Sequence, residues 1–167
     1  VLTKVKSLNP EVIYVPGYYE EVGKIVRQAR ELGMNLPIVG GDGWDSPKLV
    51  EVGSAAALNN TFFTNHYSAE DTGSASKAFV DAYKKEYGQV PDAVAVLAYD
   101  ATNVLLDAIK RANSTDPGKI REALANTKNF PAVTGATTLN ATHDAVKSAV
   151  IIEMKDGKQV FKATINP

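Results

Sequence analysis

The sequence has 167 residues, 44% of them hydrophobic and 22% charged, an ordinary composition for one globular domain or for parts of two small ones. Eighteen basic and nineteen acidic residues give a net charge of -1 without a basic patch, so no nucleic-acid partner is expected. Cysteine is absent, which excludes disulfides and thiolate metal sites, and the apolar runs fall far short of the roughly 20 residues that span a bilayer.

The first residues look like the end of an element. Val1 is not methionine and begins no signal-peptide pattern, and residues 2–8 are typical of the last turns of an amphipathic helix, which Asn9-Pro10 ends. We therefore expect a fragment or a processed product. Residues 11–16 then form a short apolar run, which predicts a strand covered on both faces.

A helix and a second strand are predicted next. From Glu20 to Leu32 apolar residues recur at helical spacing, with acidic residues at the start and Gly33 after the end. Residues 36–40 predict the second strand. Two strands joined by a helix in this way form a right-handed βαβ unit with a parallel sheet.

The glycine-rich stretch at residues 38–47 is the feature around which the chain is organised. It predicts the end of a strand, a turn whose glycines allow positive φ and close backbone approach, and a helix start at Ser46 and Pro47. Ligands of open α/β sheets bind outside the carboxyl ends of the strands. Asp42 is therefore a carboxylate at a predicted ligand site, with Trp44 beside it.

The remaining elements change the rhythm of the chain. A short helix is predicted at residues 47–53, a strand at 60–64 and a polar crossover at 65–74. Three helices follow at 74–87, 92–112 and 116–127, the second of them buried on most sides. A threonine-rich segment at 133–139 and a hairpin at 149–165 come last. Because helices and strands stop alternating after the crossover, we expect two lobes, each incompletely represented.

An enzyme is not expected. The only histidines, His66 and His143, fit no metal-ligand spacing, and no nucleophile elbow is present. Asp42 and Asp45 are more typical of a ligand contact and a helix cap than of an acid–base pair. A near-match to the dinucleotide fingerprint in the same turn lacks its third glycine, and Asp42 would repel a pyrophosphate. The aspartate favours a cationic group such as an ammonium.

Each candidate residue also has a structural alternative. For Asp42 an Asx turn is as plausible as ligand binding. Tyr18 and Tyr19 follow the first strand and could line a pocket, although Tyr19 equally suits packing over the sheet. Trp44 is either a pocket wall or a lid over the short helix. Asp100, inside the apolar helix, is interpreted as structural.

Several linked motifs, taken together, resemble the periplasmic Leu/Ile/Val-binding family. They occur along the whole chain in the family's order and correspond to its C-terminal half. The motifs are LTKVK and NPEVIYVPGYYEE (residues 2–6 and 9–21), RQARELG (27–33), GGDGWDSP (40–47), LAYDA (97–101) and KSAVIIE (147–153).

The resemblance implies a type I periplasmic binding protein, in which two flavodoxin-like α/β lobes, each a parallel sheet flanked by helices, close on a ligand in a cleft. Residues 1–65 would belong to the second lobe and residues 66–147 would return to the first. Residues 148–167 would form the C-terminal hairpin that crosses back. The family's N-terminal half would be absent.

The resemblance also implies roles for individual residues. An acidic residue at the position of Asp42 takes the ligand's α-ammonium, the following Gly43 lets the backbone approach, and the aromatic side chain of Tyr18 contacts the ligand. Trp44 remains a candidate beside them. Val94 falls where some relatives place an aromatic contact. Many relatives have glutamate at the Asp42 position, so the shorter aspartate would seat the ammonium differently. No metal and no cofactor are expected.

The leading hypothesis is therefore a fragment of an exported, periplasmic or extracellular solute-binding protein that delivers a branched-chain amino acid to the membrane subunits of an ABC importer. Because the donors for the ligand's α-carboxylate belong to the absent half, the isolated chain should bind weakly or not at all. Its exposed lobe faces could also form a homodimer. The alternatives are a sensor domain of the same fold and an excised or designed half-protein that only folds and self-associates.

Overall fold

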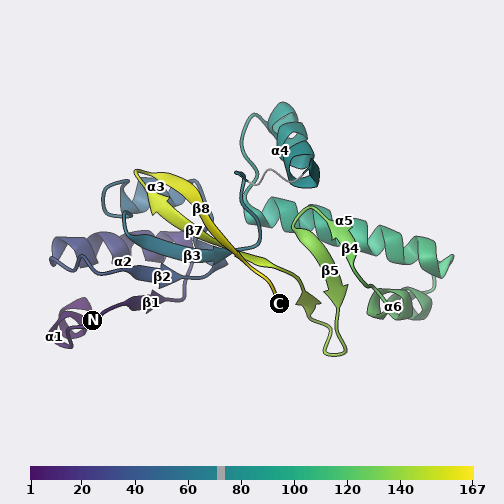
Figure 1. The fold of residues 1–167 in the computed structure, drawn as a ribbon, viewed down its shortest axis with the longest axis horizontal. Helices are drawn as coiled ribbons and strands as arrows, with labels where there is room; N and C mark the ends of the chain where they lie inside the picture. Colours follow the sequence, from purple (N-terminus) through teal and green to yellow (C-terminus); the bar gives the residue numbers. More distant parts are fainter. Residues whose placement is uncertain (71–73) are drawn as a thin grey trace. The chain divides into compact units, whose positions relative to one another are not determined.

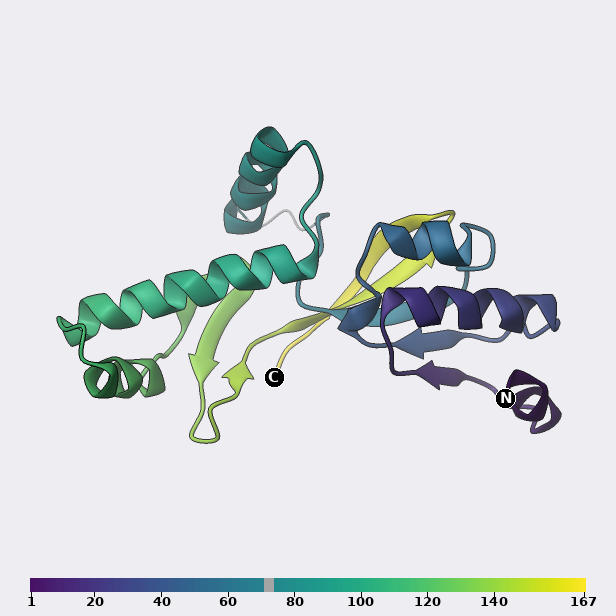
Figure 2. The same ribbon diagram turned by 180° about the vertical axis from the view of Figure 1, so that it is seen from behind.

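The computed structural model describes residues 1–70 and 74–167 (Figures 1 and 2). The chain divides into two compact units. Unit 1 contains residues 1–70 and 150–164, and unit 2 contains the described residues 74–149 together with residues 165–167. Each unit is described by itself.

Unit 1 is built on a five-stranded sheet in the order β1-β2-β3-β7-β8. The strands are β1 (Ile13–Val15), β2 (Ile38–Gly40), β3 (Thr61–Asn65), β7 (Ala149–Lys155) and β8 (Lys158–Ile165). The first three are parallel, in the register Tyr14 to Val39 to Phe62, and β7 runs antiparallel to β3. The predicted hairpin is present: Asp156 and Gly157 both adopt positive φ in its two-residue turn.

Two helices lie on one face of this sheet, α2 (Tyr19–Glu31) and α3 (Lys48–Gly53), and a short α1 (Leu2–Ser7) precedes the first strand (Figure 2). Successive right-handed crossovers that step in the same direction place both helices on the same face. α2 and α3 touch at Gly23, where an added Cβ would lie 2.9 Å from Val52 and from the Gly53 nitrogen. Glycine therefore allows the two helices to pack at short distance.

Arg30, near the end of α2, joins two loops of unit 1. Burial lowers the pKa of its guanidinium, which still stays charged at neutral pH. The guanidinium donates at 2.7–3.4 Å to five backbone carbonyl oxygens, those of Met34, Leu36, Ala57, Asn59 and Asn60. These contacts hold the segments that lead into β2 and β3, and so help set where both strands end.

Unit 2 contains the helices α4 (Ser74–Tyr87), α5 (Ala93–Ala112) and α6 (Pro117–Ala125) and a small antiparallel sheet in the order β4-β5-β6. Its strands are β4 (Phe130–Ala132), β5 (Gly135–Leu139) and β6 (Ala145–Val146). Aspartates cap two helices through backbone N–H groups: Asp92 accepts from Ala95, and Asp116 accepts from Lys119 ahead of Pro117.

Asp100 fastens the β4-β5 turn to α5. Its buried carboxylate accepts hydrogen bonds from the backbone nitrogens of Val133 (2.8 Å) and Thr134 (2.9 Å). The structural interpretation of Asp100 is therefore confirmed. The segment predicted at 133–139 is a turn followed by β5, because these two bonds hold Val133 and Thr134 between the strands.

Two burial predictions are wrong. β1 is not covered on both faces, because it is an edge strand whose Tyr14 side chain is exposed on the face opposite the helices. The α5 helix is not buried on most sides: Val94, Leu105 and Leu106 are exposed among the described residues, whereas Val96 faces inward. Periodicity identifies an apolar surface but not what covers it.

The division of the chain also differs from the predicted boundaries at 65 and 147. Residues 66–70 stay with unit 1, and the last residues of the chain, 165–167, group with unit 2. Contacts explain the first shift: His66 pairs with Asp42, and the Glu70 carboxylate accepts from the Phe161 backbone nitrogen in β8 at 3.0 Å.

Candidate functional site

The carboxyl ends of three parallel strands place polar side chains along one edge of the unit 1 sheet. Tyr18 follows β1, Asp42 follows β2, and His66 follows β3 directly. Since the strands are adjacent in the order β1-β2-β3, Asp42 comes from the middle strand. This edge is where open α/β sheets bind their ligands.

The glycine-rich turn leaves β2 as a single 3-10 turn, Asp42–Trp44. The turn does not use the positive φ that glycine allows: among the described residues with positive φ, none is Gly40, Gly41 or Gly43. The prediction of close approach holds at two of them. A Cβ on Gly40 would overlap the Trp44 ring, and one on Gly43 would lie 2.8 Å from the Gly17 carbonyl oxygen. The glycines are needed for space, not for a left-handed backbone.

Trp44 does not face the site. Its side chain has 0% of its surface exposed, its Nε1 donates to the Val15 carbonyl oxygen at 3.2 Å, and its ring lies 5.9 Å from that of Phe63. The prediction that Trp44 lines a ligand pocket is therefore wrong. The indole fills the space that glycine leaves open at position 40, beneath the turn that contains Asp42.

Asp42 presents its carboxylate to solvent, with 61% of its side-chain surface exposed. One oxygen, Oδ2, lies 2.9 Å from Nε2 of His66. In an Asx turn the Asp42 carboxylate would accept from the backbone N–H of Trp44, two residues on, but that N–H donates to the Gly41 carbonyl oxygen at 3.2 Å. The carboxylate is thus held by a side chain from the neighbouring strand, and its other oxygen can accept from a ligand.

His66 is the site residue that the sequence reasoning missed. Its imidazole is 34% exposed, and its backbone N–H donates to the Asn65 side chain at 2.8 Å. The position of His66 in the sequence could have indicated this role, because His66 follows β3 as Asp42 follows β2, and parallel strands end at one edge of a sheet. Metal-ligand spacing and nucleophile motifs give no indication of it.

Tyr18 and Gly43 lie against each other. The Tyr18 side chain is 73% exposed, and a Cβ on Gly43 would stand 3.0 Å from its Cδ1. The ring thus packs over the turn that carries Asp42. The neighbouring Asp45 accepts from the Gln159 side chain of β8 at 2.7 Å, and Ser46 Oγ accepts from the Lys48 nitrogen near the start of α3. Pro47 is therefore the N-cap residue rather than the first helical residue, and α3 begins one residue later than predicted.

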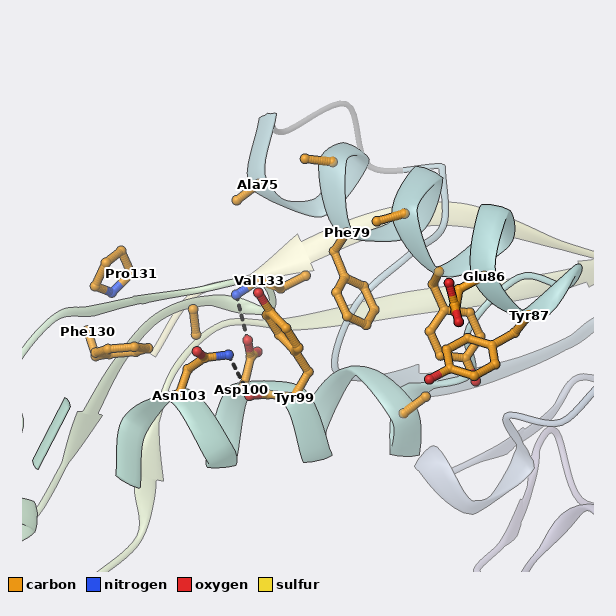
Figure 3. Close-up of a pocket in the computed structure, with 15 residues that line it drawn as sticks. Ala75, Phe79, Glu86, Tyr87, Tyr99, Asp100, Asn103, Phe130, Pro131 and Val133 are labelled. Atoms are coloured by element: carbon orange, nitrogen blue, oxygen red, sulfur yellow. Dashed lines mark hydrogen bonds between the residues drawn. The ribbon is translucent and has the colours of Figure 1, made fainter. Parts of the chain in front are cut away.

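Val94 belongs to unit 2, where it is the second residue of α5 and is 72% exposed. Unit 2 also contains a groove of about 750 Å³ between α4, α5 and β4 (Figure 3). Phe79 of α4 points across it to Tyr99 of α5, their ring centroids 4.7 Å apart. The walls are mainly aromatic rings and alanines, with Glu86, Asp100 and Asn103 as polar members.

The described part of the chain offers no group of three or more His, Cys, Asp or Glu side chains arranged to hold a metal ion. Among the same residues no helix has the length and apolar character needed to cross a bilayer.

Comparison with known proteins identifies the fold and the family. The profile of the family described as "Periplasmic binding protein" matches residues 1–159. The Leu/Ile/Val-binding protein BraC3 of Rhizobium johnstonii is 34% identical over 144 residues, which are 85% of this chain and 38% of that protein. The Leu/Ile/Val-binding protein homolog 3 of Brucella melitensis is 33% identical over 163 residues, 96% of this chain and 43% of that protein.

Two solved structures show the same fold. The leucine-binding protein LivK of Thermotoga maritima is 44% identical with a TM-score of 0.93. The substrate-binding protein LivJ of Streptococcus pneumoniae, determined with isoleucine, is 40% identical with a TM-score of 0.87. Each comparison covers 99% of this chain and 47% of the other, so the chain spans less than half the length of these relatives.

These findings confirm the resemblance seen in the sequence motifs and the α/β fold that it implied. The family and the relatives are solute-binding proteins rather than enzymes. The chain belongs to the periplasmic binding protein family.

Proposed function

We propose that this chain carries the ammonium-binding part of a site for an aliphatic, branched-chain amino acid. The observation that carries the proposal is the exposed Asp42 carboxylate at the carboxyl edge of the parallel strands, in a chain 44% and 40% identical to a leucine-binding protein and to a protein determined with isoleucine. The complete protein is exported and delivers its ligand to the membrane subunits of an ABC importer.

The chemistry of the edge supports an ammonium ligand. A carboxylate that accepts N⁺–H donors forms short, charge-assisted hydrogen bonds of about 2.7–2.9 Å. Tyr18 adds an aromatic wall and a hydroxyl beside the carboxylate, and Gly43 keeps the turn free of a side chain. Val94 adjusts which aliphatic side chain is accepted, in the role that the family resemblance gives its position.

The site in this chain is only part of what an amino acid needs. The zwitterion also carries an α-carboxylate, and the donors that the family resemblance assigns to it lie in the half of the fold that this chain does not span. Taking a carboxylate from water without compensating donors costs a few kcal/mol. The chain alone therefore binds amino acids weakly or not at all.

The groove in unit 2 is a packing surface for the same absent half. More than half of each solved relative has no counterpart in this chain, and the groove's lining of Phe79, Tyr83 and Tyr99 is apolar like a domain core. Leu105 and Leu106 add further exposed apolar side chains on α5, outside the groove. In the isolated chain the same surface binds a second copy, and this is the physical reason for the homodimer expected from the sequence.

An amide-shift NMR titration of this chain with leucine, isoleucine and valine tests the proposal. The expected result is a dispersed spectrum that moves little at millimolar ligand. The region of the Thermotoga maritima protein that this chain does not cover is then added as a separate polypeptide. Saturable shifts at Asp42, Gly43 and Tyr18, lost in Asp42→Asn, support the proposal. A complemented protein that ignores every amino acid overturns it.

Sedimentation of the same samples tests the packing surface. We expect this chain to self-associate as its concentration rises and to form a one-to-one complex with the added half. Leu105→Lys together with Leu106→Lys should weaken both associations. A chain that stays monomeric at high concentration and ignores the added half contradicts the proposed surface.

A further inference from the structure

We propose that His66 is the positioning residue of the ammonium site: its Nε2–H donates to Oδ2 of Asp42 and turns Oδ1 toward the ligand. The identity of the ligand in this inference rests on the proposed function, whereas the contact between His66 and Asp42 does not depend on it. The 2.9 Å contact between Nε2 and Oδ2 joins two residues of unit 1.

The Asp42 side chain needs such a partner. It begins a single 3-10 turn, and 61% of its surface is exposed, so the packing around it is too open to select one χ1 rotamer. An exposed side chain that must be held still for binding pays conformational entropy when the ligand arrives. A hydrogen bond formed beforehand removes that cost, because the carboxylate is already oriented.

His66 is itself well placed to hold the carboxylate. It directly follows Asn65, the last residue of β3, which is buried and pairs with Val150 of β7. The Asn65 side chain accepts the His66 backbone N–H at 2.8 Å, which fixes the chain where it leaves the sheet. His66 therefore directly follows a strand that is paired on both sides, whereas Asp42 lies in a 3-10 turn.

Histidine suits this role because its ring nitrogen reaches the Asp42 carboxylate from the end of β3 with an N–H donor. A lysine or an arginine would place a permanent positive charge next to the ammonium ligand. That charge would neutralise Asp42 and repel the ligand.

The positioning role can be tested on this chain without a ligand. Scalar couplings report the χ1 rotamer of Asp42, and long-range ¹H–¹⁵N spectra report which nitrogen of His66 carries the proton. We expect one Asp42 rotamer and the Nε2–H tautomer. In His66→Phe, which keeps a ring but has no donor, the Asp42 couplings should become averaged. In His66→Gln, whose amide nitrogen replaces Nε2, a single rotamer should return.

Ligand affinities then test whether the orientation matters for binding. In the complemented protein we expect His66→Phe to weaken leucine binding roughly five- to tenfold, as a lost hydrogen bond to a charged group does, and His66→Gln to restore it to within about twofold. Binding of 2-hydroxy-4-methylpentanoate, which has no ammonium, should not change. In an Asp42→Asn background His66→Phe should have no further effect.

The outcomes separate the two proposals. Averaged Asp42 couplings in the wild-type chain, or equal losses for leucine and the hydroxy acid in His66→Phe, overturn the positioning role. Loss of leucine binding in Asp42→Asn but not in His66→Phe overturns only this inference. If Asp42→Asn leaves leucine binding unchanged, the proposed function fails, while the rotamer measurement still decides what His66 does.

Discussion

The two units of this chain differ in how they cover their apolar residues. Unit 1 has one core cluster that runs beneath its five-stranded sheet, with Trp44, Phe63 and Ile152 fully or almost fully buried. Unit 2 has three helices against short strands and leaves Val94 and Leu105 exposed. Unit 1 therefore buries one face of its own sheet beneath its helices, whereas the helices of unit 2 leave apolar side chains exposed. The candidate site lies on the unit that completes its core.

The largest effect should come from breaking unit 1 beneath the site. Gly40→Ala places a Cβ inside the Trp44 ring, and the backbone on both sides is held in the sheet, so we expect a loss of about 3 kcal/mol in the free energy of unfolding. Urea unfolding followed by the fluorescence of Trp44, the single tryptophan, measures it.

Gly41→Ala is the matched control for Gly40→Ala. Its added Cβ would meet no atom within 4 Å, and its φ of -103° suits any residue. We expect a change of less than about 0.5 kcal/mol. Equal destabilisation by the two variants would show that Trp44 does not pack as described.

The next effect concerns the loops of unit 1. Arg30→Met keeps the apolar stem but leaves five carbonyl oxygens without their shared donor, so we expect a loss of about 2–3 kcal/mol in the same urea experiment. Arg27→Met is the control, because Arg27 forms an exposed 3.8 Å ion pair with Glu31, worth about 0.5 kcal/mol or less. Similar losses in both variants would contradict the structural role of Arg30.

A smaller effect should be confined to unit 2. In Asp100→Asn one amide oxygen can accept from Val133 or Thr134, but the amide nitrogen then faces the second N–H donor. We expect a loss of about 1–2 kcal/mol in the local stability of the β4-β5 turn. Hydrogen exchange of the Val133 and Thr134 amides measures it. Asp107→Asn, which removes an ion pair with Arg111 on the same helix, should leave these two amides protected.

The smallest effect lies in the loop before β6. A hydrogen bond from the Thr142 hydroxyl, and a weaker one from Asn140, lower the pKa of the Asp144 carboxyl. Because the folded pKa is below the unfolded value, the stabilisation is present above the unfolded pKa and is lost as the pH falls through the lowered one. Carboxyl ¹³C NMR should show this pKa rise in Thr142→Val and stay unchanged in Thr115→Val.

Much of the fold could be predicted because its signals are local. The α4 range of 74–87, the hairpin turn at Asp156-Gly157 and the end of α2 before Gly33 follow from periodicity and turn chemistry. The short strand β4 was not predicted. Its three residues include Pro131 and lack alternation, and pairing with β5 stabilises it rather than its own propensity.

The candidate site divides in the same way. The position of Asp42 at a strand's carboxyl end could be read from the sequence, and so could Tyr18 at the neighbouring end. The orientation of Trp44 could not, because a tryptophan in a turn suits a pocket wall and a buried support equally well. The sequence also does not show that His66 meets Asp42, since 24 residues separate them and the contact requires two strands to pair.

The sequence by itself determined the family, the order of most helices and strands, and the charge that one turn presents at the edge of the sheet. Each of these depends on residues close together in the chain or on motifs in register. The tertiary structure decided which apolar side chains are buried, why Gly40 and Gly43 are glycines, and which side chain holds the Asp42 carboxylate. These depend on the space between segments far apart in sequence, which only the packed chain defines.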